Sequence, residues 1–437
     1  MQTHVTNAYL NQWSDKALQR RIDDGIRTFR MCQTDIRVVD ASGRRVPGAE
    51  ISLRQTRHQF LFGANCFLLG GYDDPGLNQR YEERYLQLFN AATVAMYWRE
   101  LEREPGRPRY AADSERVWRR PPTDPVIDWC RRHDLCINGH TLVWDNPRWQ
   151  VPTWLPKDDR AAVGRLIAKR IRELAARYGR VVQRWDVLNE KLNSFGHPPH
   201  HGDQGYPEDF DILAFREAQA ALPPEATLMI NDYMESWNPA YRGYHELIAS
   251  LVDRGARIDA VGLQCHTFAR EGMLEICRDG TRLRPTDLMG ALDNYRDLAR
   301  PIHVSEITIP QPTDDAAGEE AQAIVTRDMY RLWFSHPQVN SITWWNLSDG
   351  GAAPGEDSVL SGLIDRQHRP KQAFAALDRL INHDWKTTAD RLIADGDGQV
   401  RLRAFKGDYE VRLRIAGREV VRQATLAADG VATITLP

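Results

Sequence analysis

The sequence predicts an α/β fold, a (β/α)8 TIM barrel with a small accessory β-sandwich-like domain built from the N- and C-terminal segments. Eight short apolar runs recur at roughly helix-plus-loop spacing, which favours a barrel of alternating strands and helices. Segments on both sides of these runs alternate polar and apolar residues, as half-exposed strands do. The 437 residues exceed the roughly 250 of a barrel, which leaves room for the second domain.

The eight runs read as parallel strands buried on both faces, because branched apolar residues fill them and polar residues stand at their ends. They are Phe60–Cys66, Ala91–Tyr97, Cys136–Trp144, Val181–Leu188, Thr227–Asn231, Ala256–Leu263, Pro301–Ile307 and Ser341–Leu347. Helical stretches lie between several of them. The clearest is Asp158–Tyr178, where apolar residues from Val163 to Leu174 share one face and Gly179 closes the end.

The flanking segments predict structure outside the barrel. A helix is expected over residues 14–30 with Ser14 as its N-cap, followed by a hairpin-like β segment over residues 34–56. We expect that β segment to pack with the alternating C-terminal residues in one sandwich. The predicted units are residues 1–59 (helix and β segment), 60–380 ((β/α)8 barrel) and 388–437 (small all-β domain).

The composition of the chain bears on which kinds of partner and which cellular compartment we expect. Lys and Arg total 57 against 60 Asp and Glu, and a near-neutral chain of this kind does not favour nucleic acid. No run of 18 apolar residues occurs, so no membrane span is predicted. The six cysteines show no framework spacing, and the N-terminus shows no signal peptide, so we expect a cytoplasmic protein. Secretion stays open if a signal was removed, and the oligomeric state is undetermined.

Polar and aromatic residues gather where the predicted strands end. Glu190 and Glu306, 116 residues apart, each close such a run, where barrel enzymes place their chemistry. Two carboxylates beside one pocket are the minimum equipment for cleaving a glycosidic bond. Amides, imidazoles and indoles at the same rim suit sugar hydroxyls and ring faces.

These strand ends resemble glycoside hydrolase family 10, whose best-known members are endo-β-1,4-xylanases. The matching segments follow the family's order and extend over roughly Phe60 to Leu377. They are Gly139–Trp144, Trp185–Glu190, Ile230–Tyr233, Gly262–His266 (with Cys265 in place of Ser), Ser305–Ile307, and Gly362–Asp365 with Pro370-Lys371.

The resemblance implies a role for each site residue and implies no metal and no organic cofactor. Glu306 would be the nucleophile and Glu190 the general acid and base, with carboxyl groups about 5–5.5 Å apart. The remaining substrate-binding residues would be Asn189 at the sugar 2-hydroxyl, His266 orienting Glu306, Gln264 lining the same pocket, His140 at a hydroxyl, and Trp144 and Trp345 walling the ring.

Structural interpretations stand beside these roles. His140 and His266 are also typical of satisfied core histidines, and Trp144 of ordinary barrel packing. Asn231 and Asp232 are expected to hold a loop rather than touch substrate. Asp186 is expected to be a buried hydrogen-bonding residue. The histidines at positions 197, 200 and 201 resemble a metal cluster, but the sequence around them offers no second set of ligands.

The second strand departs from the family. Xylanases of the family carry Glu-Asn-x-Met-Lys-Trp where this chain has Thr93–Trp98, so three hydrogen-bonding groups are lost. Each lost partner is worth about 1–3 kcal/mol, and Tyr97 offers a ring face or a hydroxyl instead. Asp145–Pro147 and the loop Gly350–Asp357 also differ. The departures predict a retained reaction on an altered substrate.

The leading hypothesis is a retaining β-glycoside hydrolase that acts on xylan-type polysaccharide or xylo-oligosaccharides. One alternative is a retaining hydrolase of a different or branched β-glycan. A second alternative, from another class, is a carbohydrate-binding protein on a hydrolase scaffold without turnover. Endo and exo action are not distinguished by the sequence, and residues 388–437, poor in aromatics, favour a structural role.

Overall fold

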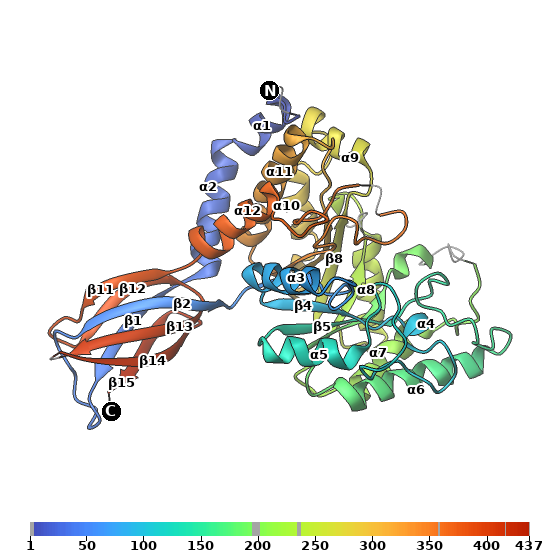
Figure 1. Ribbon diagram of the computed structural model, residues 1–437, viewed down its shortest axis with the longest axis horizontal. Coiled ribbons are helices and arrows are strands. Elements are labelled where there is room, and N and C mark those ends of the chain that lie inside the picture. The colour runs from blue at the N-terminus through green and yellow to red at the C-terminus, as the bar shows by residue number, and fades with distance from the viewer. Residues whose placement is uncertain (1–3, 195–201, 234–236, 357–358, 416, 437) are drawn as a thin grey trace.

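The barrel is closed, as predicted. The computed structural model describes residues 4–194, 202–233, 237–356, 359–415 and 417–436. Eight parallel strands form one ring in the order β10-β3-β4-β5-β6-β7-β8-β9 (Figure 1). Their bounds are β3 Leu61–Asn65, β4 Ala91–Ala95, β5 Cys136–Val143, β6 Arg184–Asn189, β7 Thr227–Asp232, β8 Ala260–His266, β9 Ile302–Thr308 and β10 Val339–Trp344.

Each of the eight predicted runs overlaps one of these strands, with shifted ends. The largest shift is at the start of β8, which begins at Ala260 rather than Ala256, and β6 begins at Arg184 rather than Val181. Val181 and Val182 do not begin β6, because their amides donate to the carbonyl of Tyr178 and so close the preceding helix. The apolar character of a buried turn is therefore indistinguishable from that of the strand it leads into.

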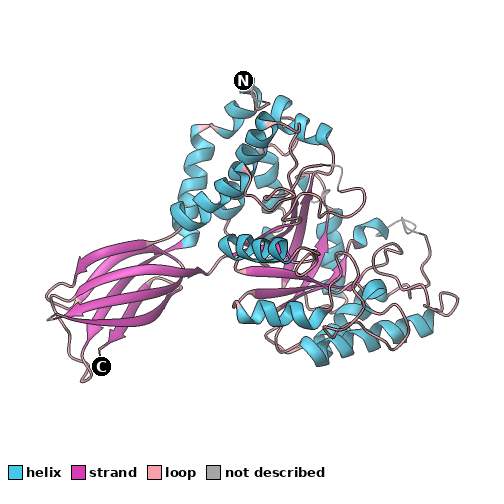
Figure 2. Cartoon of the chain, in the orientation of Figure 1, coloured by secondary structure: helices cyan, strands magenta, loops and turns pink. Residues whose placement is uncertain are grey.

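Helices surround the strands (Figure 2). They are α3 Pro75–Leu88, α4 Trp98–Leu101, α5 Thr123–Arg132, α6 Arg160–Tyr178, α7 Phe210–Ala221, α8 Gly243–Asp253, α9 Arg270–Leu274, α10 Pro285–Asp293, α11 Ala316–Ser335 and α12 Gln372–Arg379. Short π or 3₁₀ turns are η2 Lys191–Ser194, η4 Glu275–Asp279, η5 Arg296–Leu298 and η6 Leu380–Asp384. None of the helices in the described ranges is long and apolar enough to cross a membrane.

The predicted N-terminal helix forms, but with a different N-cap. It is α2 Lys16–Gly25, continued by the π turn η1 Ile26–Arg30, and a further short helix, α1 Asn7–Trp13, precedes it. The N-cap of α2 is Asp15, whose carboxylate accepts from the Leu18 amide at 2.8 Å. Ser14 is not the cap, because its amide donates to the Leu10 carbonyl and ends α1.

The accessory domain is a two-sheet sandwich built from both ends of the chain, as predicted. Its sheets have the orders β12-β1-β15 and β11-β2-β13-β14. The strands are β1 Met31–Val39, β2 Glu50–His58, β11 Thr388–Ile393, β12 Gln399–Phe405, β13 Gly407–Ile415, β14 Arg418–Leu426 and β15 Gly430–Thr435. It lies to one side of the barrel in Figure 1.

The predicted hairpin over residues 34–56 is wrong. β1 and β2 do not pair with each other but lie in opposite sheets, each hydrogen-bonded to C-terminal strands. Ile36 on β1 and Ile51 on β2 are both fully buried in the core between the sheets. The two alternating patterns therefore face one another across the sandwich, a relation that alternation alone cannot distinguish from pairing.

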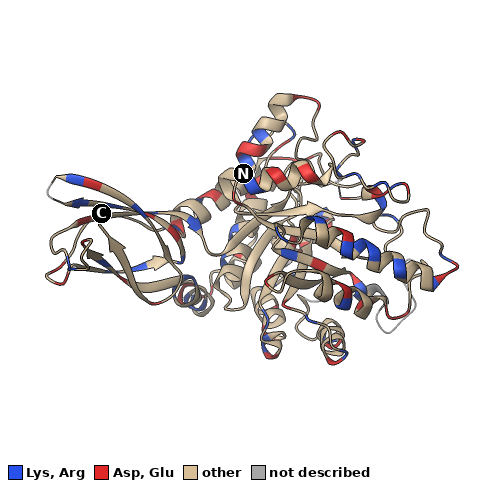
Figure 3. Ribbon diagram, turned by 90° about the horizontal axis from the view of Figure 1, so that it is seen from below, with Lys and Arg blue, Asp and Glu red and all other residues tan. Residues whose placement is uncertain are grey.

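Aromatic packing joins the sandwich to the barrel. Trp385, which follows η6, stacks on Phe334 of α11 with ring centroids 4.0 Å apart and on Phe62 of β3 at 5.8 Å. His58 of β2 contacts the Ile381 carbonyl oxygen at 3.0 Å. Acidic and basic residues are interspersed over both parts (Figure 3).

We expect Leu413→Ala to lower the free energy of unfolding by about 2–5 kcal/mol, because Leu413 is fully buried between the sheets and truncation leaves a cavity. Ile393→Ala is the matched control, with 60% exposure, and should cost less than about 1 kcal/mol. Urea unfolding followed by far-UV circular dichroism measures both. Equal losses would contradict this sandwich core.

Candidate active site

One cavity of about 470 Å³ opens at the carboxyl ends of the barrel strands. All nine side chains singled out from the sequence line it: Tyr97, His140, Trp144, Asn189, Glu190, Gln264, His266, Glu306 and Trp345. They come from β5, β6, β8 and β9 or from the residues that directly follow β4, β5, β6 and β10. The strand ends thus converge, as a closed barrel requires. The roles of the individual side chains in binding and catalysis stay predictions.

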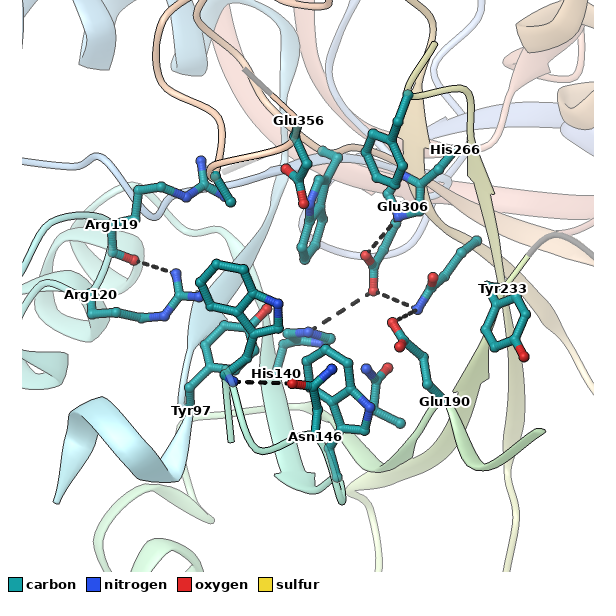
Figure 4. A pocket seen from close by; sticks show the side chains of 17 residues that line it. Tyr97, Arg119, Arg120, His140, Asn146, Glu190, Tyr233, His266, Glu306 and Glu356 are labelled. Atoms are coloured by element: carbon teal, nitrogen blue, oxygen red, sulfur yellow. Dashed lines mark hydrogen bonds and ion pairs between the residues drawn. The ribbon is translucent and has the colours of Figure 1, made fainter. Parts of the chain in front are cut away.

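Glu306 is buried and held by three side chains, one of which, His266, is labelled beside it in Figure 4. Its Oε1 accepts from Asn231 Nδ2 at 2.8 Å and from Gln264 Nε2 at 3.2 Å. Its Oε2 lies 3.0 Å from His266 Nε2. Because Thr308 Oγ1 is 2.8 Å from the other ring nitrogen and can donate to it, His266 can present its Nε2 proton to the carboxylate.

Glu190 follows β6 with a left-handed backbone, φ 51°, and its amide donates to the Asn231 carbonyl at 2.9 Å. Its Oε1 accepts from Gln264 Nε2 at 3.3 Å. Burial raises the pKa of Glu190 well above its usual value, and the charges of Glu306 and Asp232 raise that pKa further. Glu190 is therefore suited to carry a proton near neutral pH.

The two carboxylates share one amide nitrogen. Gln264 Nε2 lies 3.3 Å from Glu190 Oε1 and 3.2 Å from Glu306 Oε1, so those oxygens are at most about 6.5 Å apart, the two distances laid end to end. That limit accommodates the roughly 5–5.5 Å between carboxyl groups in retaining glycosidases. It leaves little room for the roughly 6.5–9.5 Å of inverting ones.

His140 lies between Asp186 and Glu306. Its Nδ1 is 2.7 Å from Asp186 Oδ2, and its Nε2 is 4.0 Å from Glu306 Oε1. Asp186 also accepts from Asn138 Nδ2 at 2.9 Å and is 1% exposed, in agreement with its interpretation as a buried hydrogen-bonding residue. With Nδ1–H donated to Asp186, His140 turns an acceptor nitrogen toward the cavity.

Aromatic rings form the walls. Trp345 lies edge-on to His140 at 5.4 Å and to His266 at 5.9 Å between ring centroids. Tyr97 lies edge-on to His140 at 5.2 Å and tilted to Trp144 at 6.3 Å. These rings are buried among one another, so Tyr97 and Trp144 serve packing and the cavity wall at once.

Sequence reasoning missed Asn231 as a positioning residue. Its Nδ2 donates to Glu306 Oε1 and to Asn189 Oδ1, both at 2.8 Å, while its Oδ1 accepts from Ser305 Oγ at 2.5 Å. Its position at a strand end was the available signal. Asp232, by contrast, accepts from the Leu192 amide at 3.0 Å and holds a loop, as expected.

Further residues that line the cavity were not predicted. They are Arg119, Arg120, Asn146, Trp149, Tyr233, Phe268, Ala353 and Glu356. Most stand in loops without periodicity. The three histidines 197, 200 and 201 lie outside the described residues, as does Asp357. Within the described ranges, no group of three or more His, Cys, Asp or Glu is placed to hold a metal ion.

A closed (β/α)8 barrel whose strand ends bring two carboxylates together is the architecture of many glycoside hydrolases. The chain belongs to glycosyl hydrolase family 10, whose model matches residues 72–379. The resemblance drawn from the strand ends is thereby confirmed.

Similar proteins include the anti-sigma-I factor RsgI6 of Acetivibrio thermocellus, 24% identical over 93% of this chain and 47% of that protein. Endo-1,4-beta-xylanase 1 of Arabidopsis thaliana is 24% identical over 86% of this chain and 35% of that protein. The chain thus spans about half of the first relative and a third of the second.

Among solved structures, xylanase 10B from Thermotoga petrophila in complex with xylobiose superposes with a TM-score of 0.61 at 21% identity. The match covers 75% of this chain and 95% of that one. At this identity the likeness shows the fold alone, which agrees with the barrel described above.

We expect Glu306→Gln to lower the pKa of Glu190 without returning it to its usual value, because burial is the largest cause of the shift and the Glu306 charge the second. Carbon-13 NMR titration of labelled glutamate side chains measures this. Glu356→Gln is the matched control, since Glu356 lines the same cavity but is not among the leading causes of the Glu190 shift. A Glu190 pKa that is the same in the parent protein and in both variants would contradict the electrostatic effect of Glu306 on Glu190.

Proposed function

We propose that the protein is a retaining β-glycoside hydrolase that works by double displacement on xylan-type polysaccharide or xylo-oligosaccharides. The observation that carries this is the single amide of Gln264 between two carboxylates in unlike surroundings. Glu306 accepts three hydrogen bonds, which suits an anionic nucleophile, whereas the pKa of Glu190 is raised, which suits an acid.

In the first step Glu306 attacks the anomeric carbon, and its oxygen supplies the electron pair of the new ester-like bond. The glycosidic bond breaks, its electrons pass to the leaving oxygen, and Glu190 gives that oxygen its proton. Asn231 and His266 hold Glu306 in place. Gln264 bridges the pair throughout, because its amide has two protons.

In the second step Glu190, now a carboxylate, takes a proton from water, and the resulting hydroxide attacks the anomeric carbon. The bond to Glu306 breaks and the carboxylate is restored. Two inversions give net retention. Glu190 returns to its protonated form, so the enzyme is ready for another turnover.

The substrate class rests on relatives. The family match and the similarity to endo-1,4-beta-xylanase 1 of Arabidopsis thaliana support xylan-type substrates. The changed second strand supports the rival, a different or branched β-glycan, because Tyr97 lines the cavity where the family pattern has Lys. A panel of aryl β-glycosides and oligosaccharides separates the two. Reducing ends released from no glycan would favour the binding protein without turnover.

We expect Glu306→Gln to lower kcat by roughly 10⁴-fold or more while oligosaccharide binding persists, since the nucleophile is lost but the cavity shape is kept. Glu271→Gln, an exposed change, should leave both unaffected. Proton NMR of the parent enzyme's first product should show the β anomer. A first-formed α anomer would exclude the double displacement.

The dependence of kcat/KM on pH should report the protonation state of Glu190. Because Glu190 must be protonated in the first step, kcat/KM should fall as pH rises through its raised pKa. Glu190→Ala should remove this alkaline limb for aryl glycosides with good leaving groups, which need no acid. For substrates with poor leaving groups, the variant should lose about 10²–10⁴-fold in rate. An alkaline limb that survives the substitution would assign it to another group.

A further inference from the structure

The cavity wall contains a buried cation that the double displacement does not use. Arg120 is 8% exposed, and its guanidinium carbon lies 3.9 Å from the ring centroid of Tyr97 and 5.2 Å from that of Phe67. Its Nη1 donates to the Arg119 carbonyl at 2.8 Å. Among the described residues, no carboxylate forms an ion pair with Arg120, and no hydrogen bond is made by its Nε or Nη2.

The neighbouring Arg119 is committed elsewhere. Its Nη1 donates to Asn346 Oδ1 at 2.9 Å and to the Gly351 carbonyl. Asn346 Nδ2 in turn donates to Glu356 Oε2 at 3.0 Å, so an amide links this arginine to the nearby acid. Arg119 therefore fastens the loop after β10, and Glu356 offsets its charge. Arg120 has no comparable link.

Arg120 remains charged at neutral pH. Burial is the largest cause that lowers the pKa of Arg120, to about 10, and the charge of Arg119 also lowers it. The charges of Glu100 and Glu356 raise that pKa. A buried, protonated guanidinium without a paired anion destabilises the folded protein, because the charge has lost part of its hydration. A ligand that brings an anion to the guanidinium would compensate for that loss. The planar group accepts a carboxylate through two parallel hydrogen bonds, and Nε and Nη2 form one such edge.

The position of Arg120 assigns it to one side of the scissile bond. In Figure 4, Arg119 and Arg120 lie on one side of Glu306, and Glu190 and Tyr233 lie on the other. The leaving group departs beside its proton donor, Glu190, so the sugar bonded to Glu306 extends toward the arginines. Contacts run from Glu306 through His140 and Tyr97 to Arg120.

We propose that Arg120 binds the carboxylate of a uronic acid, present as a unit or a branch on the glycone side of the substrate. This rests on the proposed hydrolase function and specifies its substrate class. A neutral sugar would displace water from the guanidinium and offer only uncharged acceptors. A uronate offers two oxygens and the missing negative charge, so the site discriminates in its favour.

The test uses two matched substrates: a xylo-oligosaccharide that carries glucuronic acid on a glycone-side xylose, and the same molecule with its carboxyl group reduced to the primary alcohol. The parent enzyme should cleave the charged substrate with at least a tenfold higher kcat/KM. Arg120→Gln should bring the ratio close to one, and Arg120→Lys should restore part of it, since Lys keeps the charge but not the planar fork.

Arg148→Gln is the matched control. Arg148 is exposed and stacks on Trp149 at 4.4 Å, but it does not line the cavity, so the ratio should stay at the parent value. A parent ratio of one or less, or an Arg120→Gln ratio equal to the parent's, would overturn the proposal. Should Arg120→Gln fail to fold in a thermal-unfolding control, the parent ratio still decides.

Calorimetry on Glu306→Gln separates the two proposals. Tighter binding of the glucuronic acid substrate than of its reduced form supports the uronate site, even if the parent enzyme cleaves neither and the hydrolase proposal fails. Equal binding of both forms, with the parent cleaving both at one rate, overturns the uronate site and leaves the hydrolase proposal standing.

Discussion

The candidate site depends on the side-chain amide of Gln264, which lies between two carboxylates that would repel each other if both were charged. Its two N–H groups satisfy one oxygen on each acid, and burial favours the neutral form of Glu190. One acid can then stay anionic while its neighbour holds a proton. The unlike roles of the two glutamates follow from these surroundings, since the side chains are chemically identical.

The neighbouring barrel strands fix the amides and imidazole that surround Glu306. Asn231 on β7 contacts Asn189 on β6 and Glu306 on β9, so three strands are tied by one side chain. Gly262 on β8 makes this possible, because a Cβ there would lie 2.4 Å from Asn231 Oδ1. The absence of a side chain on one strand thereby leaves room for the Asn231 side chain on the next, and hydrogen bonds from neighbouring strands hold Glu306 in position.

The barrel and its strand ends could be predicted from the sequence because they follow short-range rules, whereas the resemblance to the family singled out the nine pocket residues at those ends. A buried parallel strand is an apolar run, and its carboxyl end must face the cavity. The sandwich pairing could not be predicted in the same way, because β1 and β2 show alternation whether they pair or face one another across a core. Arg119 and Arg120 carry no local pattern, so only the folded loop places them at the cavity.

These unpredicted arginines change what the altered second strand means. Read by itself, the replacement of Lys by Tyr97 removes a positive charge from the cavity. In the folded chain Arg120 covers the Tyr97 ring, so a cation stands in that region again but is carried by a different segment. The Tyr97 ring supports a planar guanidinium, which an alkyl-ammonium side chain in its place would not do. The departure is thus the exchange of a compact point charge for a stacked, two-pronged one, and such a group selects planar anions over hydroxyls.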